Sequence, residues 1–582
     1  MRSTSTPALL LALLLATPVS IPLAARVATA QVERPAEQLP EPVEPEADLE
    51  TPSLTLPPIG PPGTPAPPTP STRPEPPEAL RVTVREIAFR GATRFSQGEL
   101  AALAAPWLGR PLSSGDLAAL VRSITQRYVD AGYVTSGALL PDQDLASGRL
   151  QIEIVEGRVE EIAIEGARSF RPAWFRTRLE RATRAPVDVE RLADQLAVFQ
   201  RNPRIERVQA VLEPTDRIGV TRLRVAVQEA SPYDFQLHAS NESPPAIGSW
   251  GGGPELTIAN LVGWGDTLSI AARFTRGLQQ VSVQERFPLN RYDTELVASY
   301  RYTEADVVDS PFAFADITSQ AHQAELELRH PVWRSGPHEV WLGVVGSWAR
   351  SRARLLGGTA CVEADLVDCE PTASVVRLRQ EYLWRSRSTV VSARSSLSFG
   401  FSSRLLDSTR EREAEGADSE FVSWLAQVRW LQRLPTERLG WHWPPSPLLV
   451  VRGDVQLAND PLLPTEQIAI GGPDTVRGYR RNALVRDSAA IGSVELRVPV
   501  WTRPFGEPVV ELGPFFDIGG ATDARGPIGL RTLSSVGLAL RVHPGMGLRA
   551  EASWGHRLRD ALDAGEGWQR DGIYLQVAWD VF

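Results

Sequence analysis

The chain of 582 residues contains no lysine, so arginine supplies all of its 61 basic side chains. Asp and Glu together number 70, and the formal net charge at pH 7 is -9. A negative charge balance argues against nucleic acid as the main partner. We attribute the exclusive use of arginine to a coding bias and draw no mechanism from it.

Motifs typical of enzymes are also scarce. The 7 histidines show no spacing typical of a metal site, and no G-x-S-x-G motif stands beside a suitable partner. The G-x-x-x-x-G-K-[ST] motif of ATP-binding loops is absent. We therefore expect neither enzymatic activity nor a cofactor.

The chain has only 2 cysteines, Cys361 and Cys369, in a polar segment. In an oxidising compartment, a disulfide that closes a small loop is the default expectation for such a pair. Two thiols without a nearby histidine are a poor ligand set, so we expect no metal site here. The sequence leaves the oxidation state of the pair open.

Long apolar runs are missing after residue 30. The N-terminus combines Arg2, a short apolar run over residues 8–16 and the sequence Ala28-Thr29-Ala30, which predicts a secretory signal peptide over residues 1–30. No later segment reaches the roughly 18 to 20 apolar residues of a transmembrane helix. A mature protein that resides in a membrane must then cross it as a closed barrel, because only helices and barrels satisfy every backbone polar group in lipid.

Residues 31–80 hold 16 of the 48 prolines, together with a cluster of acidic residues. This composition predicts an extended linker that builds no core. A helix in the linker could form only over residues 46–54, and Pro52 interrupts that segment.

Two similar α+β units are predicted after the linker, over residues 81–156 and 157–230. In each unit a strand is followed by two helices and two further strands, with apolar residues first at helical and then at alternating spacing. The sequence IAFRGA at residues 87–92 returns as IAIEGA at residues 162–167, at the same place in the second unit. We interpret the pair as an internal repeat.

The helical period disappears in residues 231–582, where apolar and polar residues alternate along sixteen candidate strands. The links after odd-numbered strands are mostly long and polar, whereas those after even-numbered strands are mostly short. Long loops on one rim and short turns on the other are typical of outer-membrane barrels. The candidate strands lie near 233–242, 254–261, 265–276, 279–288, 293–303, 320–331, 338–350, 374–385, 388–402, 420–432, 447–458, 488–500, 508–518, 531–542, 545–555 and 572–582.

Two short motifs in this half carry most of the functional information. Val476-Arg477-Gly478-Tyr479 lies in a polar loop between predicted strands, and Phe515-Phe516-Asp517-Ile518-Gly519 lies in a later strand. An arginine at a glycine-hinged loop tip and an aspartate in a strand are natural partners, because a guanidinium binds a carboxylate with two hydrogen bonds. If they meet inside a barrel, the loop is tied down within the pore as a gate or an assembly latch.

The neighbouring residues fit this interpretation. Asp517 shares a strand face with Phe515 and Gly519, and Gly519 leaves room for a close backbone approach. Tyr479 is expected to pack against protein while its hydroxyl stays hydrated. The simpler alternative is a surface turn with a solvated Arg477 and a carboxylate that caps a strand end.

Together with the upstream repeats, these motifs resemble those of the two-partner secretion transporters of the outer membrane, the haemolysin-activator and filamentous-haemagglutinin type. Residues 476–479 match the V-R-G-Y/F loop motif of that family, and the residues around Asp517 match its F-x-D-x-G strand motif. The resemblance covers residues 81–582. It implies two small α+β domains of the polypeptide-transport-associated (POTRA) type, followed by a 16-stranded antiparallel transmembrane β-barrel over residues 231–582. It also implies that the sixth extracellular loop folds into the lumen, where Arg477 binds Asp517.

The function implied by the resemblance is a pore that recognises an unfolded secreted partner through periplasmic POTRA domains and moves it to the cell surface without ATP. Partner segments would add to the POTRA sheet edges by β-augmentation, with the second strand and helix of each repeat, near residues 131–137 and 205–212, as the groove walls. The alternative is an assembly factor that inserts other outer-membrane barrels. Expected partners are the exoprotein, outer-membrane lipid and the barrel-assembly machinery. The cargo, the oligomeric state and plugging of the pore by an N-terminal helix are left open.

Overall fold

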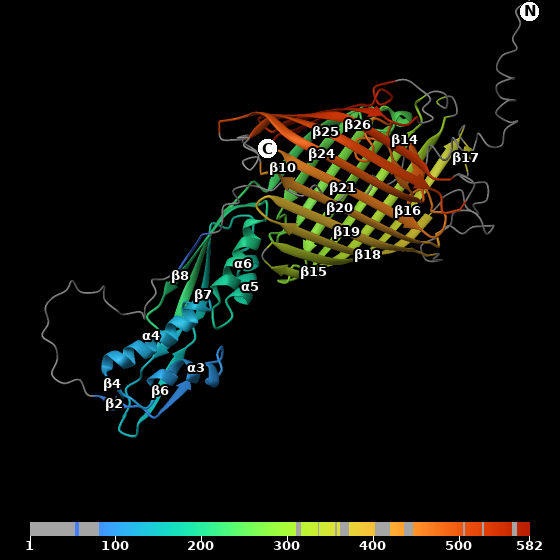
Figure 1. Cartoon of the computed structure of the whole chain (residues 1–582). Helices are drawn as coiled ribbons and strands as arrows, with labels where there is room; N and C mark the ends of the chain where they lie inside the picture. Colours follow the sequence, from blue (N-terminus) through green and yellow to red (C-terminus); the bar gives the residue numbers. More distant parts are fainter. Residues whose placement is uncertain are drawn as a thin grey trace, which may run out of the picture. The chain divides into compact units, whose positions relative to one another are not determined.

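The computed structural model describes residues 53–56 and 81–582, apart from 310–312, 314–315, 336, 356–357, 361–371, 402–418, 436–445, 505–506, 526–528 and 561–566. The predicted signal peptide and most of the predicted linker lie outside the described residues. The described chain forms two compact units, one with the α+β repeats and one with the barrel (Figure 1). Among the described residues, no helix has the length and apolar character to cross a membrane.

The first repeat packs two helices against a small sheet. Ser96 and Ser113 are the N-caps of its helices, and each closes a capping box with an acidic residue three positions later. The sheet has the order β3-β6-β5, and β2 and β4 form a separate two-stranded ribbon. The elements are β2 (Val82–Thr83), β3 (Glu86–Arg90), α3 (Gln97–Ala104), the 3-10 helix η1 (Ala105–Trp107), β4 (Pro111–Leu112), α4 (Ser114–Asp130), β5 (Gly137–Leu139) and β6 (Arg149–Val155).

The second repeat has the same order of elements and a larger sheet. Its helices bury an aromatic and aliphatic face that includes Phe175, Leu196 and Phe199. The sheet order is β1-β8-β9-β7, so a strand of the linker forms one edge. The elements are β7 (Arg158–Glu165), α5 (Pro172–Ala182), α6 (Val189–Gln200), β8 (Ile205–Pro214), β9 (Val220–Glu229) and the linker strand β1 (Ser53–Thr55).

Both repeats use one structural device at the end of their first strand. Gly91 and Gly166 have positive φ angles of 84° and 81°, and a Cβ atom at either would lie 2.3 or 2.2 Å from a backbone oxygen of a neighbouring strand. The chain then turns so that backbone N–H groups donate to Glu156 in the first repeat and to Glu229 in the second. Burial raises the pKa of both carboxyl groups, but hydrogen bonds to the carboxylates outweigh it and hold each pKa below its ordinary value.

The second unit is a closed barrel of sixteen antiparallel strands, which confirms the predicted fold class. The first and last strands pair from Gln236 opposite Asp580 to Ser240 opposite Gln576 and so close the cylinder. A short strand, β17 (Gly358–Ala360), extends the hairpin beyond β16. The barrel strands are β10 (Tyr233–Ser240), β11 (Gly251–Ala259), β12 (Thr267–Thr275), β13 (Leu278–Pro288), β14 (Glu295–Asp306), β15 (Thr318–Ser335), β16 (His338–Leu355), β18 (Thr372–Arg385), β19 (Thr389–Gly400), β20 (Val422–Arg433), β21 (Leu448–Ala458), β24 (Ser488–Thr502), β25 (Pro508–Thr522), β26 (Arg531–Gly545), β27 (Leu548–Arg557) and β28 (Ile573–Asp580).

Side chains alternate between an apolar outer face and a polar inner face of the barrel. On β15, Leu326 is 54% exposed on the outer face, whereas Glu327 is 8% exposed and faces inward. On β25, Phe516 and Ile518 are exposed outside, and Asp517 between them is buried inside. The barrel therefore encloses a polar lumen, as the alternation of the sequence predicts.

Candidate functional site

The sixth loop on the rim of mostly long loops, residues 459–487, lies against the inner wall of the barrel. It connects β21 to β24 and contains a small hairpin of β22 (Ile468–Ile470) and β23 (Leu484–Arg486). Val476 and Tyr479 of this loop are fully buried in an apolar cluster with the wall residues Ile491 and Leu533. Val494 of β24 and Val536 of β26 are exposed on the outer face, whereas Ile491 and Leu533 are buried on the opposite face, so the cluster lies inside the barrel.

Arg477, at the tip of the sixth loop, forms a buried ion pair with Asp517 of β25. Its Nε and Nη2 atoms donate to Oδ2 and Oδ1 of Asp517 at 2.8 and 2.9 Å, and its backbone N–H donates to Oδ2 at 3.0 Å. Asp517 has no exposed surface, and Arg477 is 7% exposed. This two-pronged geometry is the one in which arginine binds a carboxylate most strongly.

Three further polar residues complete the site, and the motifs gave no sign of them. Arg477 Nη1 donates to Glu495 Oε2 at 2.6 Å, and the Ser493 hydroxyl donates to Asp517 Oδ1 at 2.6 Å. Glu495 also pairs with Arg541 of β26. Strand register brings them together, because Ser493 on β24 lies directly opposite Asp517. Their inward positions follow from the alternation of polar and apolar residues along β24 and β26, which is the signal that could have found them.

The two phenylalanines of the strand motif lie on opposite faces of β25. Phe515 lies beneath the guanidinium of Arg477, with the Cζ atom 3.4 Å from the ring centroid. This is a cation–π contact in a buried setting, where such contacts are strongest. Phe516 points to the outer face and is 42% exposed, so it takes no part in the site.

Tyr479 is more deeply buried than the sequence suggested. Its side chain has no exposed surface, and its hydroxyl lies 2.9 and 2.7 Å from the carbonyl oxygens of Ser534 and Arg559. The expectation of a hydrated hydroxyl is wrong, because a backbone carbonyl group of β26 and one just after β27 take the place of water.

Glycines make the close approach of the loop tip possible. Gly478 has a φ angle of 93°, and a Cβ atom there would lie 2.8 Å from the carbonyl oxygen of Gly555 on β27. A Cβ atom on Gly555 would in turn lie 2.6 Å from the backbone nitrogen of Gly478. At Gly519 a Cβ atom would lie 3.0 Å from Val476. The tip is therefore seated backbone to backbone, a geometry that only glycine permits at Gly478.

The second repeat presents an edge that accepts an extended chain. The linker strand β1 runs parallel to β8, with Ser53, Leu54 and Thr55 opposite Gln209, Ala210 and Val211. In the first repeat, little of the predicted groove wall over residues 131–137 is strand, and its role stays a prediction. Residues 131–136 form turns after α4, with Gly132 at a φ angle of 88°, and the edge strand β5 begins only at Gly137.

The predicted disulfide cannot be located in the structure. Cys361 and Cys369 lie outside the described residues, so the disulfide stays a prediction. Within the described ranges, no group of three or more His, Cys, Asp or Glu side chains could hold a metal ion. The polar clusters described inside the barrel are arginine–carboxylate pairs such as Arg477 with Asp517.

Two protein families match the chain over separate segments. Residues 82–157 match the POTRA domain of the ShlB type. Residues 219–542, more than half of the chain, match the haemolysin secretion/activation protein ShlB/FhaC/HecB family. The chain belongs to this family. The assignment confirms the resemblance drawn from the loop and strand motifs.

Relatives of the chain are transporter proteins. The outer membrane transporter CdiB of Escherichia coli O6:K15:H31 is 24% identical over 439 residues, which cover 73% of this chain and 70% of the relative. The heme/hemopexin transporter protein HuxB of Haemophilus influenzae is 24% identical over 263 residues, covering 44% and 45%. Membership places the barrel in the outer membrane and the POTRA domains in the periplasm, with transport rather than catalysis as the activity.

Solved structures share the fold. CdiB from Escherichia coli superposes with a TM-score of 0.64 at 19% identity, covering 88% of this chain and 92% of the other. BamA from Haemophilus ducreyi lacking POTRA domains 1–3 superposes with a TM-score of 0.51 at 13% identity, covering 86% of this chain. At these identities the similarity supports the architecture of repeats and barrel.

Proposed function

We propose that the protein recognises an unfolded secreted partner through its POTRA domains and moves it through the barrel lumen to the cell surface without ATP. The observation that carries the proposal is the sixth loop, which is bound inside a polar lumen by the buried contact between Arg477 and Asp517. Membership of a family of two-partner secretion transporters supports a secreted protein as the cargo.

Capture of the partner is assigned to the edge of β8. An extended chain can add to an exposed sheet edge through backbone hydrogen bonds, with little demand on its sequence. The pairing of the linker strand β1 with β8 supports this assignment, because it is an instance of such an addition within the chain itself. An arriving partner segment would have to displace residues 53–55 from the same edge.

The contact between Arg477 and Asp517, together with Val476, Gly478 and Tyr479, acts as a latch that holds the sixth loop in its working position. Directionality needs no nucleotide, because a chain that folds at the cell surface cannot return through the lumen. The outer apolar face of the barrel contacts outer-membrane lipid, and the barrel-assembly machinery inserts the chain.

A crosslinking experiment tests capture at β8. A photoreactive residue at the exposed Gln209 of β8 is compared with one at the exposed Glu161 of β7, at the opposite edge of the same sheet. With the exoprotein co-expressed, we expect a crosslink from position 209 and none from position 161. Equal crosslinking at both edges, or none at position 209, would reject capture by β8.

Secretion itself separates the two functions that share this fold. The similarity to BamA keeps an assembly factor as the competing function. Deletion of the gene should leave other outer-membrane barrels at normal levels and retain one exoprotein inside the cell. Normal secretion of every exoprotein together with loss of other barrels would support the assembly factor instead.

A further inference from the structure

The first limb of the sixth loop, residues 459–467, is docked on a different part of the wall from its tip. Leu462 and Leu463 are 1% and 2% exposed and pack in one apolar cluster with Ala373 and Val375 of β18. By contrast, the tip binds β24, β25 and β26. In the barrel, β19, β20, β21 and β24 separate β18 from β25.

A buried ion pair lies next to this apolar contact. Arg377 of β18 is 1% exposed and is the largest fully buried side chain among the described residues. Its Nη2 atom donates to both carboxylate oxygens of Glu466 in the loop, at 3.0 and 2.9 Å. The wall holds the arginine in place, since Nη1 donates to Ser347 of β16 and lies 3.9 Å from Glu325 of β15.

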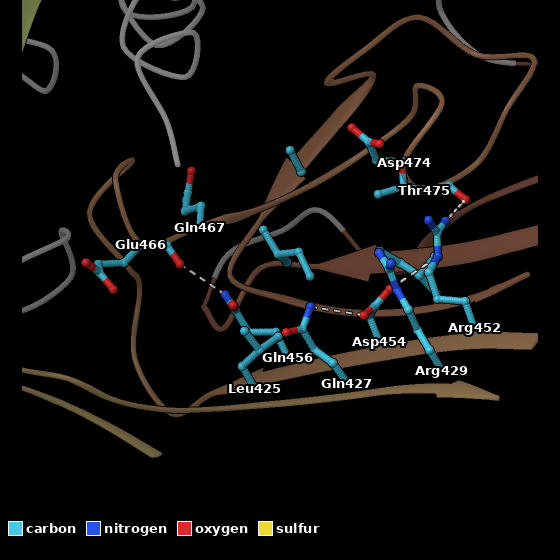
Figure 2. A pocket seen from close by; sticks show the side chains of 13 residues that line it. Leu425, Gln427, Arg429, Arg452, Asp454, Gln456, Glu466, Gln467, Asp474 and Thr475 are labelled. Atoms are coloured by element: carbon cyan, nitrogen blue, oxygen red, sulfur yellow. Dashed lines mark hydrogen bonds and ion pairs between the residues drawn. The ribbon is translucent and has the colours of Figure 1, made fainter. Parts of the chain in front are cut away.

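Between its two ends the loop lies over β20 and β21 of the wall. A cavity of about 50 Å³ lies beneath it, lined by residues of β20 and β21 and by loop residues from Glu466 to Thr475 (Figure 2). This volume holds roughly three waters. Two wall side chains that line the cavity donate hydrogen bonds to the loop. Gln456 donates to the carbonyl oxygen of Glu466 at 3.1 Å, and Arg452 donates to the carbonyl oxygen of Thr475 at 2.9 Å.

We infer that Arg377 and Glu466 form a second anchor for the sixth loop, independent of the contact between Arg477 and Asp517. The loop is then attached to the inner wall at both ends. If the tip alone is released, the first limb stays bound to β18. The lumen then opens fully only when both anchors are released. The inference rests on the proposed function, in which the sixth loop is held inside the lumen, and deepens it by adding that the held loop obstructs the pore.

The same strand offers a matched control. Arg379, two residues beyond Arg377, also faces inward, is 8% exposed and donates to Glu327 of β15 at 2.7 Å. Its partner belongs to the wall rather than to the loop. Arg379→Gln therefore removes the same kind of buried charge from the same strand and breaks an ion pair within the wall.

The test uses the full-length purified protein without any exoprotein, so its outcome does not depend on cargo. Variants Arg377→Gln, Glu466→Gln and their combination are compared with Arg379→Gln by single-channel recording in planar bilayers and by hydrogen exchange of residues 459–467. A difference in gel migration between the unheated and the heated protein reports an intact barrel. We expect Arg377→Gln and Glu466→Gln each to raise the open fraction and the exchange of the first limb at least tenfold, with no change in Arg379→Gln.

The combined variants decide whether the anchor is one unit and separate from the latch. Two residues that act through one contact are non-additive, so the double variant Arg377→Gln with Glu466→Gln should show no larger effect than either single variant. Arg377→Gln with Asp517→Asn should instead multiply the two single effects. The inference is overturned if Arg377→Gln and Arg379→Gln form folded barrels with the same open fraction and exchange rate. It is also overturned if Arg377→Gln, Glu466→Gln and Arg379→Gln all fail to form the barrel, or if the effects of Arg377→Gln and Glu466→Gln multiply in the double variant.

Discussion

Loss of Arg477 should free the tip of the sixth loop while leaving the barrel intact. Removal of one partner from a buried ion pair costs about 3–5 kcal/mol, because the other charge stays buried without compensation. In the Arg477→Ala variant, Glu495 is still paired with Arg541, and Asp517 still accepts a hydrogen bond from the Ser493 hydroxyl. We therefore expect the cost of this substitution to lie near the lower end of that range. A cost of about 3 kcal/mol corresponds to a roughly hundredfold increase in the population with a displaced tip.

Hydrogen exchange measures that population directly. The amide of Arg477 donates to Asp517, so it exchanges only when the tip opens, and its rate follows the open population. We expect roughly hundredfold faster exchange at this amide in Arg477→Ala and in Asp517→Ala, with impaired secretion and a folded, inserted barrel. The control is Ile518→Ala, which removes an outward side chain beside Asp517. Unchanged exchange at the tip, or wild-type secretion in both variants, would refute the latch.

Three further predictions follow from the same contacts and from the repeats. Phe515→Leu removes the cation–π contact and should speed tip exchange about tenfold, whereas Phe516→Leu on the outer face should have no effect; equal rates would contradict the geometry. Gly555→Ala places a Cβ atom 2.6 Å from the backbone nitrogen of Gly478, so it should unseat the tip by the same exchange measurement, and wild-type exchange would count against the backbone-to-backbone seat. Glu229→Gln should destabilise the second repeat by about 1–3 kcal/mol at pH 7, as judged by exchange of residues 168–170. Because the pKa of Glu229 is lowered in the folded protein, its contribution is present above the ordinary glutamate pKa of about 4.3 and disappears as the pH falls through the folded value; a difference from wild type that persists below that range would contradict this cause.

The strands were the most predictable part of the fold. Successive side chains of a strand point to opposite faces, so a strand between lipid and a polar lumen alternates apolar and polar residues. All sixteen barrel strands are found where this alternation predicts them. Their ends were less predictable. The strand expected over residues 320–331 spans Thr318–Ser335, because pairing with a neighbouring strand extends beyond the alternating segment.

The site was only partly predictable. Residues of a motif are neighbours in sequence, so Arg477 and Asp517 could be named in advance. Glu495, Arg541 and Gly555 lie on other strands, and only the register and the path of the loop bring them to Arg477. The anchor of Arg377 with Glu466 was missed for the same reason, since neither residue belongs to a motif. Tyr479 was misjudged because burial of its hydroxyl depends on carbonyl groups that no local pattern reveals.

Crosslinking of a stalled exoprotein tests most directly whether a partner protein passes through the lumen of this barrel. On β13, Ser282 lies on the inner face, whereas its neighbours Val281 and Val283 are exposed on the outer face. Photoreactive residues at these three positions differ mainly in whether they face the lumen or the outer surface of the barrel. We expect crosslinks to the stalled exoprotein from position 282 and none from 281 or 283. Crosslinks from the outward positions alone, or from none of the three while the stalled chain is exposed at the surface, would contradict passage through the lumen.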